Sequence, residues 1–236
     1  MNEHIAKRLI DETELLHNNE ASEWSAVEAL WRPYLAQNDV EAQFRLAYYY
    51  LFYRFDEEPQ KRDEMEKLLR TAAERAHPDA VYWLSHLYPK GAERDSLLLR
   101  AGELGSLEGQ RDLGALYATG DWAGPHDSVR AAGWYLRAAE RGHIDAQYNL
   151  GFMYLLGEGV PSDPKEGLRW LLSAANQGYE ASFRLLADLY RNGHCGVPID
   201  HAEAERWDKQ YRLSELYRMS EENRAAKEPK AADPLA

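Results

Sequence analysis

The chain has 236 residues, of which 44% are hydrophobic and 29% are charged, a composition typical of a folded protein rather than a disordered one. It carries 40 acidic and 28 basic side chains, so its formal net charge is -12. A surface of this charge repels phosphate backbones unless a local basic patch overrides it, and the sequence contains no such patch. Charge therefore argues against nucleic acid as a partner and favours a basic or neutral protein surface.

The sequence also argues against a membrane or secreted protein. No run approaches the roughly 18 consecutive apolar residues of a membrane span, and the start, MNEHIAKRLIDETELL, has acids where a signal peptide needs an apolar core. Cys195 is the single cysteine, which fits a reducing compartment. These features predict a cytoplasmic protein with no membrane partner.

Residues 1–41 are predicted to form helices that precede a set of repeats. An apolar stripe at helical spacing predicts one helix over residues 1–17, and a second stripe predicts another over 21–37. Pro33 lies inside the second run and is expected to kink the helix or split it near Trp31, because proline lacks the amide donor and clashes with the preceding turn.

From Ala42 onward one pattern recurs along the chain. A small anchor residue is followed by leucine four residues later, by a small residue at five and by tyrosine at eight, positions that share one face of a helix. The five anchors are Ala42, Ala80, Gly109, Ala146 and Ser182. A second run with Trp, paired Ala and a terminal Gly follows, so each unit is predicted to be a helical hairpin that must stack on its neighbours.

The connection GEGVPSDP is predicted to turn the chain between the two helices of a unit. Gly157 and Gly159 end the first helix, Asp163 caps the second, and Pro164 fits its first position. Glu166 is expected to complete a capping box with Asp163, an arrangement repeated in the last unit. A phosphate-loop interpretation fails, because the segment lacks the Gly-Lys-Ser/Thr ending and follows a helix rather than a strand.

The anchoring Ala, Leu-Gly, Tyr, G-x-G-V loop, Asp, Trp and paired Ala resemble the Sel1-like repeat, a relative of the tetratricopeptide repeat. Units 109–145 and 146–181 match well, and 182–217 matches in its first helix and loop. Units 42–79 and 80–108 match only the first-helix anchors and the paired small residues, and 80–108 lacks the loop. The resemblance implies an all-α fold, a right-handed α-solenoid of antiparallel helix pairs. It predicts a single solenoid over 1–217, with 1–41 as N-terminal helices and 218–236 as the end of a polar capping helix and a disordered tail.

The resemblance also implies where a partner binds. The first helix of each pair lines the concave face in such repeats, so positions two, three and six after the anchor point toward a ligand. In the first two units these positions are rich in the aromatic and arginine residues that favour interfaces. The predicted partner-binding residues are Arg45, Tyr48, Tyr82, Trp83 and His86.

A structural interpretation of these positions stays open. Aromatic residues at positions two and six can pack between adjacent first helices, and Tyr148 and Phe152 are interpreted in this way. Trp83 can instead fill space left by the shortened unit.

The sequence offers no catalytic or metal site. Its carboxylates are spread over caps and solvated faces, where their pKa values have no reason to move, and no nucleophile motif is present. His194, Cys195 and His201 do not match a closed zinc site, which needs four ligands at tighter spacing. We therefore expect no metal, no cofactor and no enzyme activity.

The predicted function is a protein-interaction scaffold or adaptor that binds a peptide or protein on its concave face. An antitoxin or immunity-type inhibitor of a basic toxin is a special case, since acidic surfaces speed association with basic partners. The alternatives are a hydrolase with a site in the solenoid groove, and self-assembly through Trp24 and Trp31.

Overall fold

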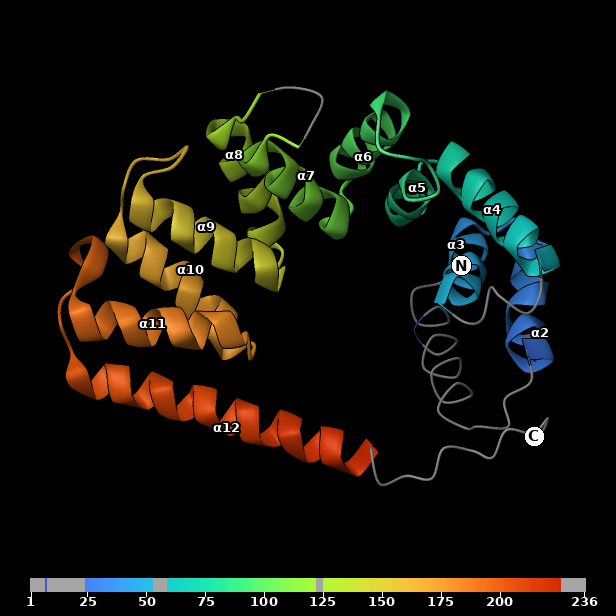
Figure 1. Ribbon diagram of the computed structural model, residues 1–236. Coiled ribbons are helices and arrows are strands. Elements are labelled where there is room, and N and C mark those ends of the chain that lie inside the picture. Colours follow the sequence, from blue (N-terminus) through green and yellow to red (C-terminus); the bar gives the residue numbers. More distant parts are fainter. Residues whose placement is uncertain (1–6, 8–23, 53–58, 122–124, 226–236) are drawn as a thin grey trace. The chain divides into compact units, whose positions relative to one another are not determined.

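A computed structural model describes residues 7, 24–52, 59–121 and 125–225, and the regular elements in these ranges are all helical (Figure 1). The described helices confirm the predicted all-α fold. The predicted helix over 1–17 lies outside the described residues except for Lys7, and residues 226–236 of the predicted tail also lie outside them.

The helices fall into two compact units, residues 1–126 and 127–236. The first unit contains α2 (Trp24–Leu35), α3 (Val40–Phe52), α4 (Pro59–Glu74), α5 (Pro78–Ser85), α6 (Ala92–Leu104) and α7 (Leu107–Thr119). The second contains α8 (Ser128–Glu140), α9 (Ile144–Leu156), α10 (Pro164–Asn176), α11 (Glu180–Asn192), the 3-10 turn η1 (His194–Gly196) and α12 (His201–Ala225). The prediction of one continuous solenoid over 1–217 stays a prediction.

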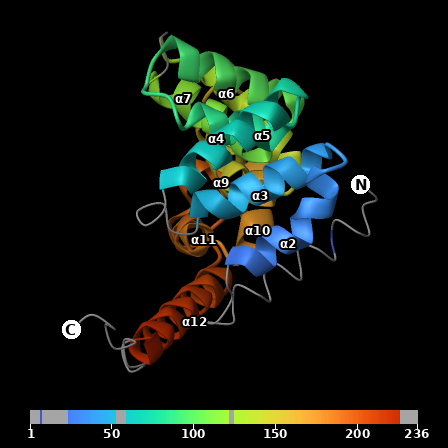
Figure 2. The same cartoon turned by 90° about the vertical axis from the view of Figure 1, so that its right-hand side faces the viewer.

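Within each unit, helices that follow one another in the chain pack side by side, as the two views of α2, α3 and α4 illustrate (Figures 1 and 2). The repeat anchors lie on the first helices α3, α5, α7, α9 and α11, and all of them are buried. The leucines four residues later are buried as well: Leu46, Leu84, Leu113, Leu150 and Leu186. The apolar face predicted from the sequence is therefore the face on which the helices stack.

Side-chain caps start the second helices where the sequence predicted them. Asp163 Oδ1 accepts hydrogen bonds from the amides of Lys165 and Glu166, at 3.0 and 3.2 Å. The predicted capping box does not form, because the amide of Asp163 donates to the carbonyl of Tyr154 at 2.9 Å. Glu166 therefore pairs with Arg169 instead. The last repeat of the chain shows the same arrangement at Asp200.

Glutamines form a further structural link that the sequence pattern did not suggest. Gln110 donates to the carbonyl of Gly102, and Gln147 donates to the carbonyl of Ala139, each at 3.1 Å. Both acceptors lie in the last turn of the preceding second helix, where carbonyls lack partners within the helix. The two side chains therefore join the first helices α7 and α9 to the ends of α6 and α8.

The structure tests two expectations for the N-terminal helices in part. The helix α2 runs through Pro33 to Leu35, so it is not split near Trp31. Pro33 has no amide hydrogen to donate to the carbonyl four residues earlier, yet helical bonding resumes beyond it, where the amide of Ala36 donates to the carbonyl of Arg32 at 3.0 Å. Trp31 has only 1% of its surface exposed, so it belongs to the core and offers no area for self-assembly. The side chain of Trp24 lies outside the described residues.

The repeat at 80–108 departs from the other repeats in its first helix. α5 has 8 residues, whereas α3, α7, α9 and α11 each have 13. This shortening accompanies the missing glycine loop that the sequence indicated.

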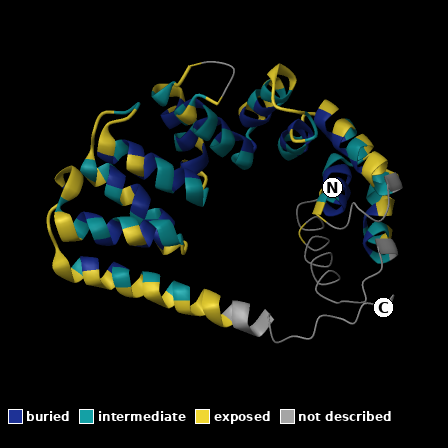
Figure 3. Cartoon of the chain, viewed as in Figure 1, coloured by how far each residue is buried: buried dark blue, intermediate teal, exposed yellow. Residues whose placement is uncertain are grey.

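The last helix, α12, exposes both polar and apolar side chains. Most side chains of residues 212–220 are exposed (Figure 3). As expected of a capping helix, many of these residues are charged, but Leu213, Leu216, Tyr217 and Met219 are also 50 to 70% exposed. In the described part of the chain, no helix combines the length and apolar character needed to cross a bilayer.

Candidate functional site

Four aromatic side chains of the first unit form one continuous surface, which we call the aromatic surface: Tyr48 and Phe52 of α3, Trp83 of α5, and His86 directly after α5. Ring centroids lie 4.6 Å apart for Tyr48 and Phe52, 5.2 Å for Phe52 and Trp83, and 5.5 Å for Trp83 and His86. The Phe52 and Trp83 rings meet edge to face, a favoured aromatic geometry. Side chains from two successive first helices thus act as one patch.

The aromatic surface is open to solvent. Tyr48 is 36% exposed and Phe52 is 50% exposed, His86 is exposed, and Trp83 is half-buried at the centre. The three predicted residues Tyr48, Trp83 and His86 are therefore brought together. Phe52 was missed because only positions two, three and six after the anchor were considered, although it lies one helical turn beyond Tyr48 on the same face.

Tyr82 lies beneath this surface rather than on it. Only 5% of Tyr82 is exposed, and its hydroxyl donates to Asp112 of α7 at 3.1 Å. Burial and the neighbouring Asp112 carboxylate raise the pKa of the Tyr82 hydroxyl. Its ring centroid lies 5.1 Å from that of Trp83, so Tyr82 supports the aromatic surface and ties α5 to α7.

Arg45 is held in a polar network at the start of α3 and α5. Its Nε donates to Glu41 at 2.6 Å, and Nε2 of His77 lies 3.1 Å from the same carboxylate. Because Nδ1 of His77 accepts from the amide of Ala80, Nε2 carries the proton and donates to Glu41. The His77 hydrogen bond, aided by the Arg45 guanidinium, lowers the pKa of Glu41 to about 2.

A second network lies between α2, α3 and α4. The Tyr50 hydroxyl donates to Glu28 at 2.9 Å, and Lys61 is also paired with Glu28. Burial raises the pKa of Glu28, but the hydrogen bonds from Lys61 and Tyr50 outweigh it and leave that pKa below its ordinary value. The expectation that no carboxylate pKa moves is therefore wrong for Glu28 and Glu41. Both groups are shifted toward the charged form, which suits ion pairing rather than proton transfer.

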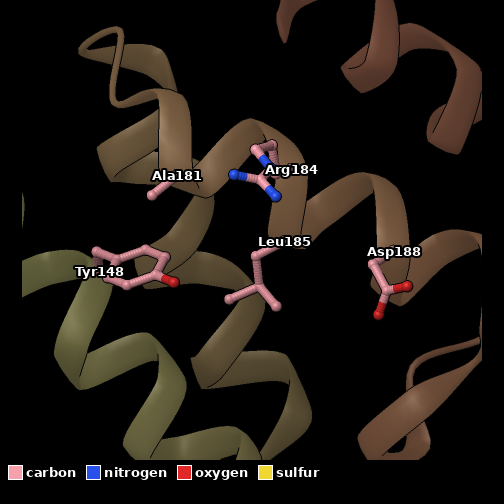
Figure 4. A pocket seen from close by; sticks show the side chains of 5 residues that line it. All are labelled: Tyr148, Ala181, Arg184, Leu185 and Asp188. Carbon is pink, nitrogen blue, oxygen red and sulfur yellow. The ribbon is translucent and has the colours of Figure 1, made fainter.

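The second unit has a pocket of about 490 Å³ between α9 and α11. Its lining residues are Tyr148, Ala181, Arg184, Leu185 and Asp188. Figure 4 shows Tyr148 facing Leu185, with Arg184 and Asp188 beside Leu185 along α11. Tyr148, interpreted from the sequence as packing, does pack against the buried core of this unit and also lines the pocket, whereas Phe152 is 40% exposed rather than packed between first helices.

The residues weighed as a metal site are not gathered. Among the described residues, no group of three or more His, Cys, Asp and Glu side chains is placed to hold a metal ion. His194 lies 3.2 Å from Asp188, and Cys195 is exposed.

Known structures of repeat proteins resemble this fold. A Sel1 repeat protein from Oxalobacter formigenes is similar with a TM-score of 0.72 and 26% identity, over 89% of this chain and 86% of that chain. A protective antigen of uropathogenic Escherichia coli is similar with a TM-score of 0.65 and 28% identity, over 84% of this chain and 46% of that chain. An immunity protein from Pseudomonas aeruginosa shares the fold with a TM-score of 0.58 and 16% identity, over 90% of this chain and 83% of that chain.

Sequence comparison agrees with the structural similarity. Among curated proteins none matches the chain. The family pattern described as Sel1 repeat matches residues 40–77, 107–143, 144–179 and 184–207, which together are more than half of the chain. The unmatched residues 78–106 contain the shortened helix α5. Sel1 repeats mediate protein–protein interaction and generally serve as non-enzymatic scaffolds. The chain belongs to the Sel1 repeat family.

Proposed function

We propose that this protein is a cytoplasmic interaction scaffold that binds a peptide or protein partner through the aromatic surface of its first unit. The observation that carries the proposal is the joining of Tyr48, Phe52, Trp83 and His86 into one solvent-exposed patch across α3 and α5. Aromatic side chains bury a large area at low entropic cost, which makes them frequent anchors of interfaces. Trp83 lies in the middle of the patch and is its proposed anchor.

The substitution Trp83→Ala tests this proposal. A partner is first captured from the native cell, and its affinity is then measured by calorimetry with the wild type and the variant. We expect Trp83→Ala to weaken binding by about 2 kcal/mol, close to 30-fold, as removal of a central anchor does. The melting temperature of the variant is expected to stay close to that of the wild type.

Trp134→Ala is the matched control. Trp134 is also half-buried and lies on the second helix α8, where the Arg137 guanidinium lies 4.6 Å from its ring centroid. Its removal should leave binding unchanged. Intact binding by Trp83→Ala together with a large loss of stability would show that Trp83 is a core residue and would reject the proposal.

We further propose that the partner is basic, as a toxin neutralised by an immunity-type protein would be. The formal charge of -12 supports this narrower proposal. The similar Pseudomonas aeruginosa protein is named an immunity protein. At 16% identity, the structural similarity to that protein supports a common fold alone. Capture of an acidic partner would reject the narrower proposal while leaving the scaffold function intact.

A further inference from the structure

Two arginines occupy the same repeat position in the two units but have different surroundings. Arg111 of α7 and Arg184 of α11 each lie two residues after the buried anchor of their helix. In the preceding first helix, the same position is held by Tyr82 of α5 and by Tyr148 of α9, respectively. The surroundings of Arg111 in the first unit can therefore be compared directly with those of Arg184 in the pocket of the second unit.

In the first unit, carboxylates of the chain itself surround the arginine. Arg111 pairs with Asp112, and its Nη2 donates to Glu108 at 3.0 Å. Asp112 also accepts the hydroxyl hydrogen bond of Tyr82 at 3.1 Å. One carboxylate thus joins the arginine to the tyrosine of the neighbouring first helix.

In the second unit, both carboxylates are replaced by apolar residues. Ala181 stands at the position of Glu108, and Leu185 stands at the position of Asp112. Among the described residues, no carboxylate forms an ion pair with Arg184, and no side chain or backbone group forms a hydrogen bond with the Tyr148 hydroxyl. The guanidinium of Arg184 lies over the ring of Tyr211, 5.5 Å from its centroid.

We infer that this pocket binds a carboxylate carried beside an apolar group of a peptide partner. The ligand carboxylate takes the role that Asp112 has in the first unit, accepting hydrogen bonds from the Arg184 guanidinium and the Tyr148 hydroxyl. Guanidinium matches the two oxygens of a carboxylate, and such charge-assisted bonds are among the strongest in proteins. The apolar group of the ligand packs on Ala181 and Leu185, and the pocket volume of about 490 Å³ accommodates a side chain of leucine size.

Asp188 sets the direction in which the ligand lies. Its Oδ1 accepts from Asn192 at 2.7 Å, and its Oδ2 lies 3.2 Å from Nδ1 of His194, so it remains fixed at the far end of the pocket. A ligand carboxylate is repelled at that end and attracted at Arg184. The inference rests on the proposed function only in taking the ligand to be part of a peptide.

The test is a nuclear magnetic resonance titration of the full chain with three small probes. N-acetyl-leucine carries a terminal carboxylate, N-acetyl-glutamyl-leucinamide carries a side-chain carboxylate, and N-acetyl-leucinamide carries none. We expect saturable shifts of the Arg184 Nε–H and Leu185 amide signals with at least one carboxylate probe, and at least tenfold weaker binding of N-acetyl-leucinamide. The better of the two carboxylate probes identifies whether a chain end or an acidic side chain is the source.

Variants of the pocket make the test specific. Arg184→Gln is expected to weaken carboxylate binding at least tenfold, and the pair Ala181→Glu with Leu185→Asp should do the same by rebuilding the arrangement of the first unit. Arg111→Gln, at the equivalent position of α7, should leave binding at Leu185 unchanged. Equal binding of the amide probe, no saturable shift with either carboxylate probe, or full binding by Arg184→Gln would overturn the inference. Because the probes are small molecules, this outcome is independent of the partner bound by the aromatic surface.

Discussion

Ala76 adopts a left-handed backbone conformation at the end of α4, with φ of 60°. Before α7, α9 and α11 this position holds a glycine: Gly105, Gly142 and Gly178 have φ of 96°, 92° and 88°, and before α3 it holds Asn38, with φ of 55°. Glycine adopts this conformation freely, whereas a Cβ atom disfavours it. At Ala76 the backbone therefore keeps the left-handed geometry of the repeat at the expense of local strain.

Replacing Ala76 by glycine should stabilise the protein. We expect Ala76→Gly to raise the free energy of unfolding by about 1 kcal/mol, because the strain removed exceeds the added chain entropy. Chemical denaturation measures the change. The same substitution in the interior of α7, Ala115→Gly, is expected to lower stability by about 0.5–1 kcal/mol. A loss of stability in both variants would contradict the strain at Ala76.

Glu41 links stability to pH. Its pKa falls from the ordinary 4.5 to about 2 in the folded protein, chiefly through the hydrogen bond from His77. A carboxyl whose folded pKa is depressed contributes stability that is present above its unfolded pKa and disappears as pH falls toward the folded value. About a third of the side chain is exposed, so solvent screening limits the contribution to about 2 kcal/mol or less.

The variant Glu41→Gln should therefore be less stable than the wild type at neutral pH, and this difference should shrink between about pH 5 and pH 2. Denaturant unfolding at a series of pH values measures it. Glu66→Gln, which removes an exposed pair with Arg70, is the control and should change stability by less than about 0.5 kcal/mol. A pH-independent difference for Glu41→Gln would rule out the linkage.

At the scale of elements, the glycine loop that connects α9 to α10 within one hairpin also packs against the preceding hairpin. Gly157 ends α9 in the left-handed conformation, as the sequence predicted. Gly159 has a further role, because a Cβ atom at this residue would lie 2.0 Å from the carbonyl oxygen of Ser128 at the start of α8. The loop after α9 therefore packs directly on the backbone of the preceding second helix.

This close approach makes Gly159 the more sensitive of two left-handed glycines. Gly159→Ala should lower the free energy of unfolding by about 3 kcal/mol or more, because it combines backbone strain with a backbone clash. Gly178 also has a positive φ of 88°, but no atom lies within 4 Å of the position that an added Cβ atom would take. Gly178→Ala should cost only about 1–2 kcal/mol. Equal losses in thermal or chemical denaturation would show that packing on Ser128 contributes nothing.

For the whole molecule, the dominant property is its formal charge of -12. With a basic partner, this charge should accelerate association, and the effect should weaken with added salt because exposed charges are screened beyond about 10 Å at 0.1 M ionic strength. We expect the association rate to fall roughly tenfold or more between about 0.02 and 0.5 M salt, with a smaller change in the dissociation rate. Stopped-flow mixing measures both rates. An association rate that is independent of salt would contradict electrostatic steering.

The sequence by itself determined the helical repeat, because that pattern depends on local periodicity. Leucines and small residues recurring on one helical face, together with Asp163 and Gly157 at helix ends, need no distant contact to be recognised. The aromatic surface was predictable in part for the same reason, since Tyr48 and His86 lie six residues after their anchors and Trp83 lies three after its anchor, positions that face away from the core stripe.

Only the tertiary structure decided which of these residues are exposed and which are paired. Tyr82 and Trp83 are neighbours in sequence, yet the hydrogen bond of Tyr82 to Asp112 of α7 makes it a buried link while Trp83 remains half-exposed. The pocket beside Arg184 likewise depends on what surrounds the arginine, since α7 and α11 carry arginine at the same position and differ in the side chains around it. Periodicity is a property of one helix, whereas burial and pairing arise from contacts between residues about 30 positions apart.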